Sequence, residues 1–256
     1  MNHRMATHCV IATVAVTLAS AAHPQIAVPV TGEPHHHQVY SDTHVRSFSV
    51  EVPAHTSTLL HQHERDYVWV GLGAATFVNA VAGKAEVPVV AVNGSVHFSK
   101  GGFAHVARID GEAPFRNVTI ELLDPQTNPR NLCEAVVAGQ PLHCPAGGDA
   151  MYRGASVRAA FATDQMRVSA IAIAPDGTLR VAASKDPRLL IPLQNVDESV
   201  TLTCETPGQR PSSRFRLSTG QGFTPPTGVG CAVRNGGRDS LHLLAMEFGD
   251  QGQRPR

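Results

Sequence analysis

Residues 61–70 read HQHERDYVWV, with two histidines one residue apart, then a carboxylate, then an apolar run. Alternate residues of a β-strand point to the same face, so a strand here would project the imidazoles of His61 and His63 together. A strand that faces the interior of a β-barrel would also hold both rings out of bulk water. The pattern therefore indicates a metal site built on a strand.

The spacing of these two histidines does not identify a site by itself. The chain contains 14 histidines in 256 residues, and a chance His-x-His pair is expected about once in such a chain. A second pair, His35 and His37, lies in the polar, proline-containing segment of residues 23–38. Residues 35–37 could hold a metal loosely, but we expect this segment to be an extended, solvated lead-in.

The composition narrows the class of protein. Lys and Arg together number 21, and so do Asp and Glu, so no excess of positive charge favours nucleic acid or an anionic membrane as a partner. Charged residues make up 16% of the chain, which also contains 22 Gly and 18 Pro. This balance favours short strands and many turns over long helices, and the length is sufficient for two domains.

The first 22 residues are typical of an export signal. An apolar run from Cys9 to Leu18 is followed by the small residues Ala19 to Ala22, and the run is too short to span a membrane. A buried strand is the alternative interpretation. With cleavage near Ala22, the mature protein is expected to be secreted or periplasmic, with no membrane segment and in an oxidising compartment.

Four cysteines remain after such a cleavage. Cys133 and Cys144 are close together in a polar segment that contains Pro and Gly, and we predict a disulfide between them. A bridge between Cys204 and Cys231 could also form, although neither residue lies in an obvious loop.

Strand patterns alternate with turn signals through most of the chain. They run from Val45 to Leu123 and again from Ala155 to Phe248, without a sustained 3.6-residue apolar period. Residues 124–150 interrupt the rhythm. The sequence therefore predicts an all-β protein, with a barrel or sandwich over 39–123, a connector over 124–150, a second such domain over 151–250 and a polar tail over 251–256.

The two halves resemble each other. Residues 61–72 align with 182–193, and residues 100–108 align with 226–234, at offsets of 121 and 126. The alignment pairs Gly102 with Gly228, but it places Ala182, Ser184 and Cys231 opposite the histidines of the first half, His61, His63 and His105. We expect two copies of one barrel, of which the second has lost its metal site.

The motifs resemble those of a bicupin, a protein with two cupin-type jelly-roll barrels in tandem. The first cupin motif is Gly, five residues, His-x-His, three or four residues, Glu, six residues and Gly; the second is Gly, five residues, Pro-x-Gly, two residues, His, three residues and Asn. The first half matches with His61, His63, Gly73, Gly94, Gly102 and His105. It departs from the pattern at His55, Asp66, Lys100 and Ile109, with Asp66 in place of the Glu and one residue early. The second half keeps Gly220, Pro226, Gly228 and Asn235.

The resemblance implies one divalent transition metal ion, which could be Fe, Mn, Ni, Cu or Zn, bound by His61, His63, His105 and Asp66. Asp66 needs a bend or bulge to join the histidines, and it could instead orient one of them from behind. A set of satisfied polar groups without a metal is the structural alternative. Tyr67, Trp69 and Arg108 could line the pocket, although aromatic strand residues usually pack in a core and an arginine usually forms a local ion pair.

Three functions follow from this interpretation. The first is a metal-dependent enzyme that acts on a small organic molecule, with dioxygenase-type oxidation ahead of isomerisation or hydrolysis. The second is a non-catalytic module that binds a small ligand or a metal, and the third is a structural or storage-like protein with a vestigial site. The second barrel would then serve packing, closure of the pocket or formation of a homodimer.

Overall fold

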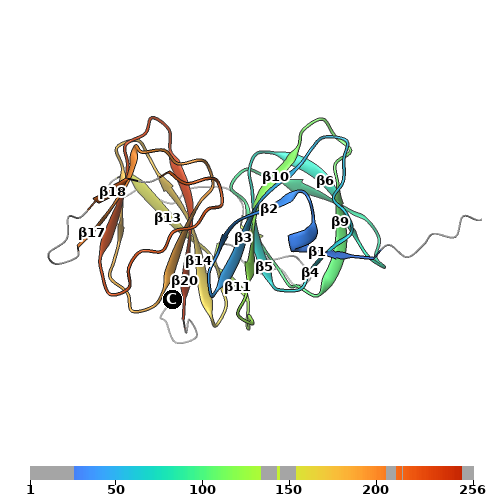
Figure 1. The fold of residues 1–256 in the computed structure, drawn as a ribbon, viewed down its shortest axis with the longest axis horizontal. Coiled ribbons are helices and arrows are strands. Elements are labelled where there is room, and N and C mark those ends of the chain that lie inside the picture. Colours follow the sequence, from blue (N-terminus) through green and yellow to red (C-terminus); the bar gives the residue numbers. More distant parts are fainter. Residues whose placement is uncertain (1–25, 134–142, 145–153, 206–211, 215, 250–256) are drawn as a thin grey trace, which may run out of the picture.

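Two β-barrels, one from each half of the chain, lie side by side in the computed structural model (Figure 1), which describes residues 26–133, 143–144, 154–205, 212–214 and 216–249. Within these residues the protein is all-β apart from one short 3-10 turn, η1 (Val30–Gly32). No helix in the described ranges is long and apolar enough to cross a membrane. The proposed signal, residues 1–22, and the tail, residues 251–256, lie outside the described residues.

The first barrel is formed by two sheets. One sheet has the order β1 (Val28–Pro29), β4 (His61–His63), β9 (Phe103–Arg108), β6 (Ala75–Val81) and β7 (Val87–Ala91). The other has the order β12 (His143–Cys144), β8 (Val96–Ser99), β5 (Tyr67–Gly71), β10 (Phe115–Leu122), β3 (Val45–Val52) and β2 (His36–Ser41).

The second barrel repeats this plan. One of its sheets has the order β11 (Arg130–Asn131), β13 (Ala155–Ala162), β14 (Met166–Ile173), β20 (Leu241–Phe248) and β16 (Arg188–Pro192). The other has the order β15 (Thr178–Val181), β19 (Cys231–Asn235), β17 (Val200–Cys204) and β18 (Ser212–Arg214).

The sheet of β5, β10 and β3 is buried on both faces, which explains the nearly continuous apolar sequence of β5 (YVWVG). In β5, Trp69 faces the interior of the first barrel, while Val68 and Val70 face the second barrel. In β10, Val118 and Ile120 share that outward face. They pack in one core cluster with residues of β14, β16 and β20. Figure 1 shows β14 and β20 beside β3 and β5, between the barrels.

The molecule consequently has three apolar cores, one inside each barrel and one between them. The interior of the second barrel is packed with aliphatic side chains from β14, β15, β17, β19 and β20. Polar and aromatic contacts also join the barrels: Ser47 Oγ donates to the carbonyl oxygen of Gly220 at 3.0 Å, and the rings of His44 and Phe248 stack with centroids 4.5 Å apart.

The barrels extend beyond the predicted domain boundaries. Residues of the expected lead-in form β1, which pairs in parallel with β4, and part of β2, which pairs with β3. The first barrel therefore begins before residue 39. The expected connector also contributes to both barrels, because β12 pairs with β8 and β11 pairs with β13.

The predicted disulfide and the pairing that was left open have different outcomes. Cys204 and Cys231 form a disulfide across the β17–β19 ladder, where the two residues face each other in register. A directly opposed cross-strand pair requires no loop, which is why the absence of one was a poor guide. Cys133 is also disulfide-bonded, but the side chain of Cys144 lies outside the described part of the structure, so the Cys133–Cys144 pairing stays a prediction.

Candidate metal centre

The pairing of β4 with β9 brings the three predicted histidines together. His61 faces His105 in the antiparallel register, and His63 lies two residues further along the same face of β4. Ring centroids are 4.5 Å apart for His61 and His105, 5.1 Å for His61 and His63, and 5.3 Å for His63 and His105. His61 is 1% exposed and His63 is 2% exposed, so the predicted cluster forms inside the barrel.

A fourth histidine, His36, joins the cluster from β2. Its ring centroid lies 4.8 Å from that of His61 and 5.9 Å from that of His63, and its side chain is 6% exposed. The ligand atoms of His36, His61 and His63 all lie within 4.8 Å of one another. Sequence reasoning missed His36, because we expected residues 35–37 to be solvated.

Glu33 holds His36 in place. Its Oε2 lies 2.6 Å from His36 Nδ1 and accepts from the backbone N–H of His35 at 2.8 Å, while Oε1 accepts from the N–H of Leu59 at 3.2 Å. Burial acts to raise the pKa of Glu33, but the hydrogen bond and positive charge of His36, with those of His35, lower it to about 2. The ionised carboxylate can only accept, so His36 Nδ1 donates to it, which leaves Nε2 as the ring nitrogen that could face a metal ion.

Two other histidines are oriented in the same way. Nδ1 of His61 lies 3.0 Å from the carbonyl oxygen of Leu59, and Nδ1 of His105 lies 2.7 Å from Oδ1 of Asn79. Both partners are acceptors, so each Nδ1 donates and each Nε2 carries a lone pair. Acceptors behind the ring are the usual arrangement for histidines that bind metals.

Three buried nitrogen atoms of the cluster have no hydrogen-bond partner within the described part of the chain: His61 Nε2, His63 Nδ1 and His105 Nε2. Leaving a buried polar atom unpaired costs about 1–3 kcal/mol, and such atoms are rare in folded proteins. A divalent transition metal ion accepts electron pairs from several imidazoles at once. The donor set therefore fits a metal ion better than it fits a set of satisfied polar groups.

The protonation state of the cluster also suits a metal ion. Burial disfavours the imidazolium and, with the charge of neighbouring histidines, lowers the pKa of His61 to about 4, of His63 to about 2 and of His105 to about 3. All three rings are neutral near pH 7. A neutral imidazole is the form that binds metals.

Asp66 does not join the histidines, which corrects our expectation for this residue. Its Oδ2 accepts from Lys100 Nζ at 2.8 Å and its Oδ1 accepts from the backbone N–H of Gly101 at 3.0 Å. Asp66 lies between β4 and β5, and no bulge there turns it inward, so its carboxylate pins the turn that leads into β9.

Tyr67, the next residue, occupies the position at which the cupin motif has Glu. It is the first residue of β5 and is buried, with its ring stacked on His63 at 4.2 Å and 19°. Burial raises its pKa to about 12. A neutral phenol beside His63 therefore replaces the carboxylate that the motif predicts.

The histidines open onto a cavity of about 260 Å³ inside the first barrel. Tyr67 and Trp69 line it as expected, and Trp69 stacks on His97 with centroids 3.7 Å apart. Arg108 does not line it: its guanidinium forms ion pairs with Glu86 and Asp110, each at 2.9 Å, on the exposed side of β9. The described lining contains no Lys, Arg, Asp or Glu.

The second barrel keeps the scaffold without the ligands. Gly102 N–H donates to the carbonyl oxygen of His63 at 2.7 Å, and Gly228 N–H donates to that of Ser184, also at 2.7 Å, which supports the alignment of the two halves. His105 has Val81 as its neighbour on β6, whereas Cys231 has Cys204 as its neighbour on β17.

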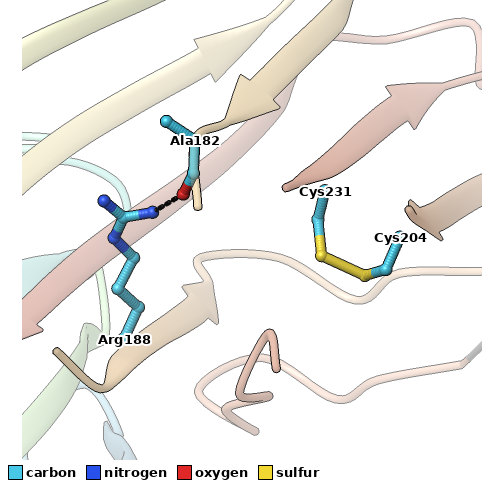
Figure 2. Close-up of a disulfide and its surroundings, with 4 residues drawn as sticks. All are labelled: Ala182, Arg188, Cys204 and Cys231. Carbon is cyan, nitrogen blue, oxygen red and sulfur yellow. Dashed lines mark hydrogen bonds between the residues drawn. A yellow bond between two sulfur atoms is a disulfide. The ribbon is translucent and has the colours of Figure 1, made fainter. Parts of the chain in front are cut away.

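Figure 2 shows the counterparts of two ligands in the second barrel. Cys231, aligned with His105, is bridged to Cys204, while Ala182, aligned with His61, accepts a hydrogen bond from Arg188 through its carbonyl oxygen. A disulfide thus occupies the position of the ladder at which the first barrel has the candidate ligand His105.

Comparison with known proteins supports this fold. No protein-family model and no curated protein matches the sequence. Among solved structures, AerE from Microcystis aeruginosa is similar, with a TM-score of 0.54 and 9% identity over 85% of this chain and 99% of that one.

Two oxalate decarboxylases are similar to the same degree. The enzyme of Lactobacillus farciminis, in its formate complex, gives a TM-score of 0.54 and 11% identity over 82% of this chain and 78% of that one. The enzyme of Bacillus subtilis at pH 4.6 gives a TM-score of 0.55 and 12% identity over 81% of this chain and 69% of that one. At these identities the likeness establishes the bicupin fold, two cupin-type barrels in tandem, as the resemblance in the motifs implied.

Proposed function

We propose that the first barrel binds one divalent transition metal ion through His36, His61, His63 and His105 and uses it to act on a small organic molecule. The observation that carries this proposal is a cluster of buried histidines. The rings of His61, His63 and His105 lie with centroids 4.5–5.3 Å apart and each has a nitrogen without a partner in the described residues, and the ligand atoms of His36, His61 and His63 lie within 4.8 Å of one another. A similar solved structure concerns the Mn(II) centres of the oxalate decarboxylase of Bacillus subtilis, which supports a divalent ion in this fold.

Dioxygenase-type oxidation is the favoured chemistry. Hydrolysis and isomerisation need a general acid or base in contact with the substrate. Apart from the four clustered histidines, the described lining offers only Tyr67, whose pKa burial raises to about 12, and His97, whose Nε2 lies 2.9 Å from Ser95 Oγ and whose ring stacks on Trp69. A bound redox-active ion would supply activation of dioxygen and of the coordinated substrate. The chain itself would orient the ligands through Glu33, Leu59 and Asn79 and would exclude water with the walls of the barrel.

Metal content of variants tests the site. Protein purified without a His-tag should contain about one metal ion per chain, and His61→Ala, His105→Ala and His36→Ala should each lose most of it. His37→Ala is the matched control for His36, because His37 is the next residue of β2 and is exposed. Asp66→Asn should keep the metal. Equal metal content in the wild type and in all three ligand variants would overturn the proposal.

A non-catalytic binding module is the second candidate. The absence of carboxylate and lysine side chains from the described lining favours it, because binding requires neither. Oxygen consumption with a panel of small molecules separates the two functions: consumption that depends on His61 supports the enzyme, whereas saturable binding without turnover supports the binding module.

We also propose that the protein is exported. The apolar run and small residues within 1–22 support this, as does the disulfide between Cys204 and Cys231, since disulfides persist in oxidising compartments. Mass spectrometry of the mature protein should find an N-terminus near residue 23; an intact N-terminus in the cell interior would contradict export.

A further inference from the structure

A separate groove lies outside the first barrel, where the two barrels diverge. The outer face of β3 and β10 packs on the second barrel through residues such as Ser47 and Val118. Further along the same strands, Glu51 and Arg116 face each other in register beyond this contact. Because twisted sheets that pack face to face separate toward their corners, a groove of about 510 Å³ remains there.

Hydrogen bonds hold the wall that the second barrel contributes to this groove. Asn195 Oδ1 accepts from the backbone N–H of Thr219 at 3.0 Å and from its hydroxyl at 3.2 Å. The next residue, Gly220, donates its N–H to the carbonyl oxygen of Pro192 at 2.8 Å and accepts from Ser47 through its own carbonyl oxygen. The wall is therefore ordered before a ligand arrives, which lowers the cost of binding.

The charged side chains of the groove compensate each other. Arg116 donates from Nε and Nη2 to the two carboxylate oxygens of Glu51 at 3.1 and 3.3 Å, and both side chains are about half exposed. The described lining of the groove contains no other Lys, Arg, Asp or Glu. Sites for phosphate or carboxylate groups present a cation to the ligand, so this lining favours a ligand without net charge.

The groove also keeps hydrogen-bonding capacity for a ligand. Thr219 occupies Asn195 Oδ1, but Asn195 Nδ2 has no partner in the described part of the chain. A guanidinium has five N–H donors and a carboxylate about four lone-pair sites, so Arg116 and Glu51 retain donors and acceptors beyond their two mutual bonds. Val39 and Leu72 add apolar surface to the same lining.

We propose that this groove binds a neutral saccharide. Sugar hydroxyls both donate and accept, so they can use Arg116, Glu51 and Asn195 together, while the C–H faces of the rings pack on the apolar surface. The volume of the groove lies in the range of small-molecule sites. Successive residues of a strand point to opposite faces: His36 lines the cavity inside the first barrel and His37 lines the groove, so the two sites lie on opposite sides of one sheet.

Binding of the full protein to immobilised glycans tests the proposal. The array carries neutral oligomers of hexose and of N-acetylhexosamine, together with their sulfated and uronic counterparts. We expect the protein to bind neutral glycans and to bind the charged counterparts no more tightly. The neutral glycan that gives the strongest signal is then titrated in solution by calorimetry, which yields its Kd.

Arg116→Met and Arg108→Met form a matched pair that locates the binding. Each breaks an exposed ion pair on the first barrel, that of Arg116 with Glu51 or that of Arg108 with Glu86. Exposed ion pairs contribute little to stability, so both variants should fold. Arg116→Met should weaken binding of the glycan at least about ten-fold, the equivalent of about 1.4 kcal/mol, whereas Arg108→Met should leave the Kd unchanged.

A second pair tests the wall from the other barrel. Asn195→Asp keeps the oxygen that accepts from Thr219 but removes the Nδ2 donor, so it should also weaken binding. Asn93→Asp is the control, because Asn93 Oδ1 likewise accepts from a backbone N–H, that of Gly73 at 2.9 Å, but Asn93 does not line the groove.

Three results would overturn the proposal. One is that the array shows no binding to any neutral glycan. Another is tighter binding to sulfated or uronic glycans, which would make the ligand an anion. The third is a Kd that is the same in Arg116→Met and Asn195→Asp as in their controls, which would place the glycan outside this groove.

Discussion

At the scale of single residues, Glu33 determines how His36 can act. It is buried and accepts three hydrogen bonds, one of them from His36. Glu33→Gln replaces the charge with a weaker acceptor, so we expect the affinity for the metal to fall about 10- to 100-fold. Competition with a chelator of known affinity measures the change.

Glu64→Gln is the matched control, because Glu64 is exposed and directly follows His63. Its affinity for the metal should equal that of the wild type. An unchanged affinity in Glu33→Gln would show that His36 needs no carboxylate to hold its ring.

The buried histidines also predict how the metal-free protein responds to acid. Their pKa values of about 4, 2 and 3 for His61, His63 and His105 lie below the unfolded value of about 6.5. As pH falls below about 6.5, the unfolded chain therefore takes up protons that the folded chain refuses, and stability decreases by up to about 1.4 kcal/mol per pH unit for each histidine.

Urea unfolding of the metal-free protein between about pH 7 and pH 5 measures this slope. His105→Gln should reduce it by the share of one histidine, whereas His55→Gln, at an exposed position, should not. Identical slopes in the wild type and in His105→Gln would contradict the lowered pKa of His105.

The contrast between His105 and His36 shows what the sequence could predict at this scale. His61, His63 and His105 fall on positions of the cupin motifs, so the resemblance was sufficient to predict that these three cluster. His36 reaches the site only because β2 pairs with β3 in a register that turns it inward between the exposed His37 and the half-buried His35. Two signals were available: the alternation in residues 35–40 (HHHQVY), and Glu33, which lies three residues before His36. Because residues 35–37 are all histidine, the sequence does not show which of them points inward on a strand.

At the scale of elements, Asp66 and Tyr67 show why a motif one residue out of step misleads. Successive strand residues point to opposite faces, so a shift of one residue exchanges the side chain in the site for the one outside it. Strand existence could be predicted from alternation and turn signals, whereas the pairing of β1 with β4 and of β12 with β8 depends on contacts between distant segments.

The disulfide between β17 and β19 gives a prediction at the same scale. It joins residues 27 apart in the sequence, and the chain entropy of a loop of that length corresponds to about 3–4 kcal/mol of stability. The double variant Cys204→Ser with Cys231→Ser should lose about that much free energy of unfolding, measured by urea denaturation. Its metal content should not change, because the first barrel holds the ligands; loss of metal would show that the second barrel supports the site directly.

At the scale of the whole molecule, the apolar core between the barrels predicts that they unfold together. Leu189 of β16 is fully buried in this core and packs in the cluster that includes Val68 and Val70 of β5. Leu189→Ala should cost about 2–5 kcal/mol. The single tryptophan, Trp69, lies in the first barrel, so its fluorescence reports the unfolding of the first barrel, whereas the substitution is in the second.

We expect the fluorescence and far-UV circular dichroism transitions to shift by the same amount in Leu189→Ala, since sheets buried against each other lose their packing in one step. Val157→Ala, at an exposed position of β13, should shift neither. A fluorescence midpoint that stays at the wild-type value, while circular dichroism shows a separate early transition, would mean that the barrels are independent. The folding of the first barrel, and of the metal site inside it, would then not depend on the second barrel.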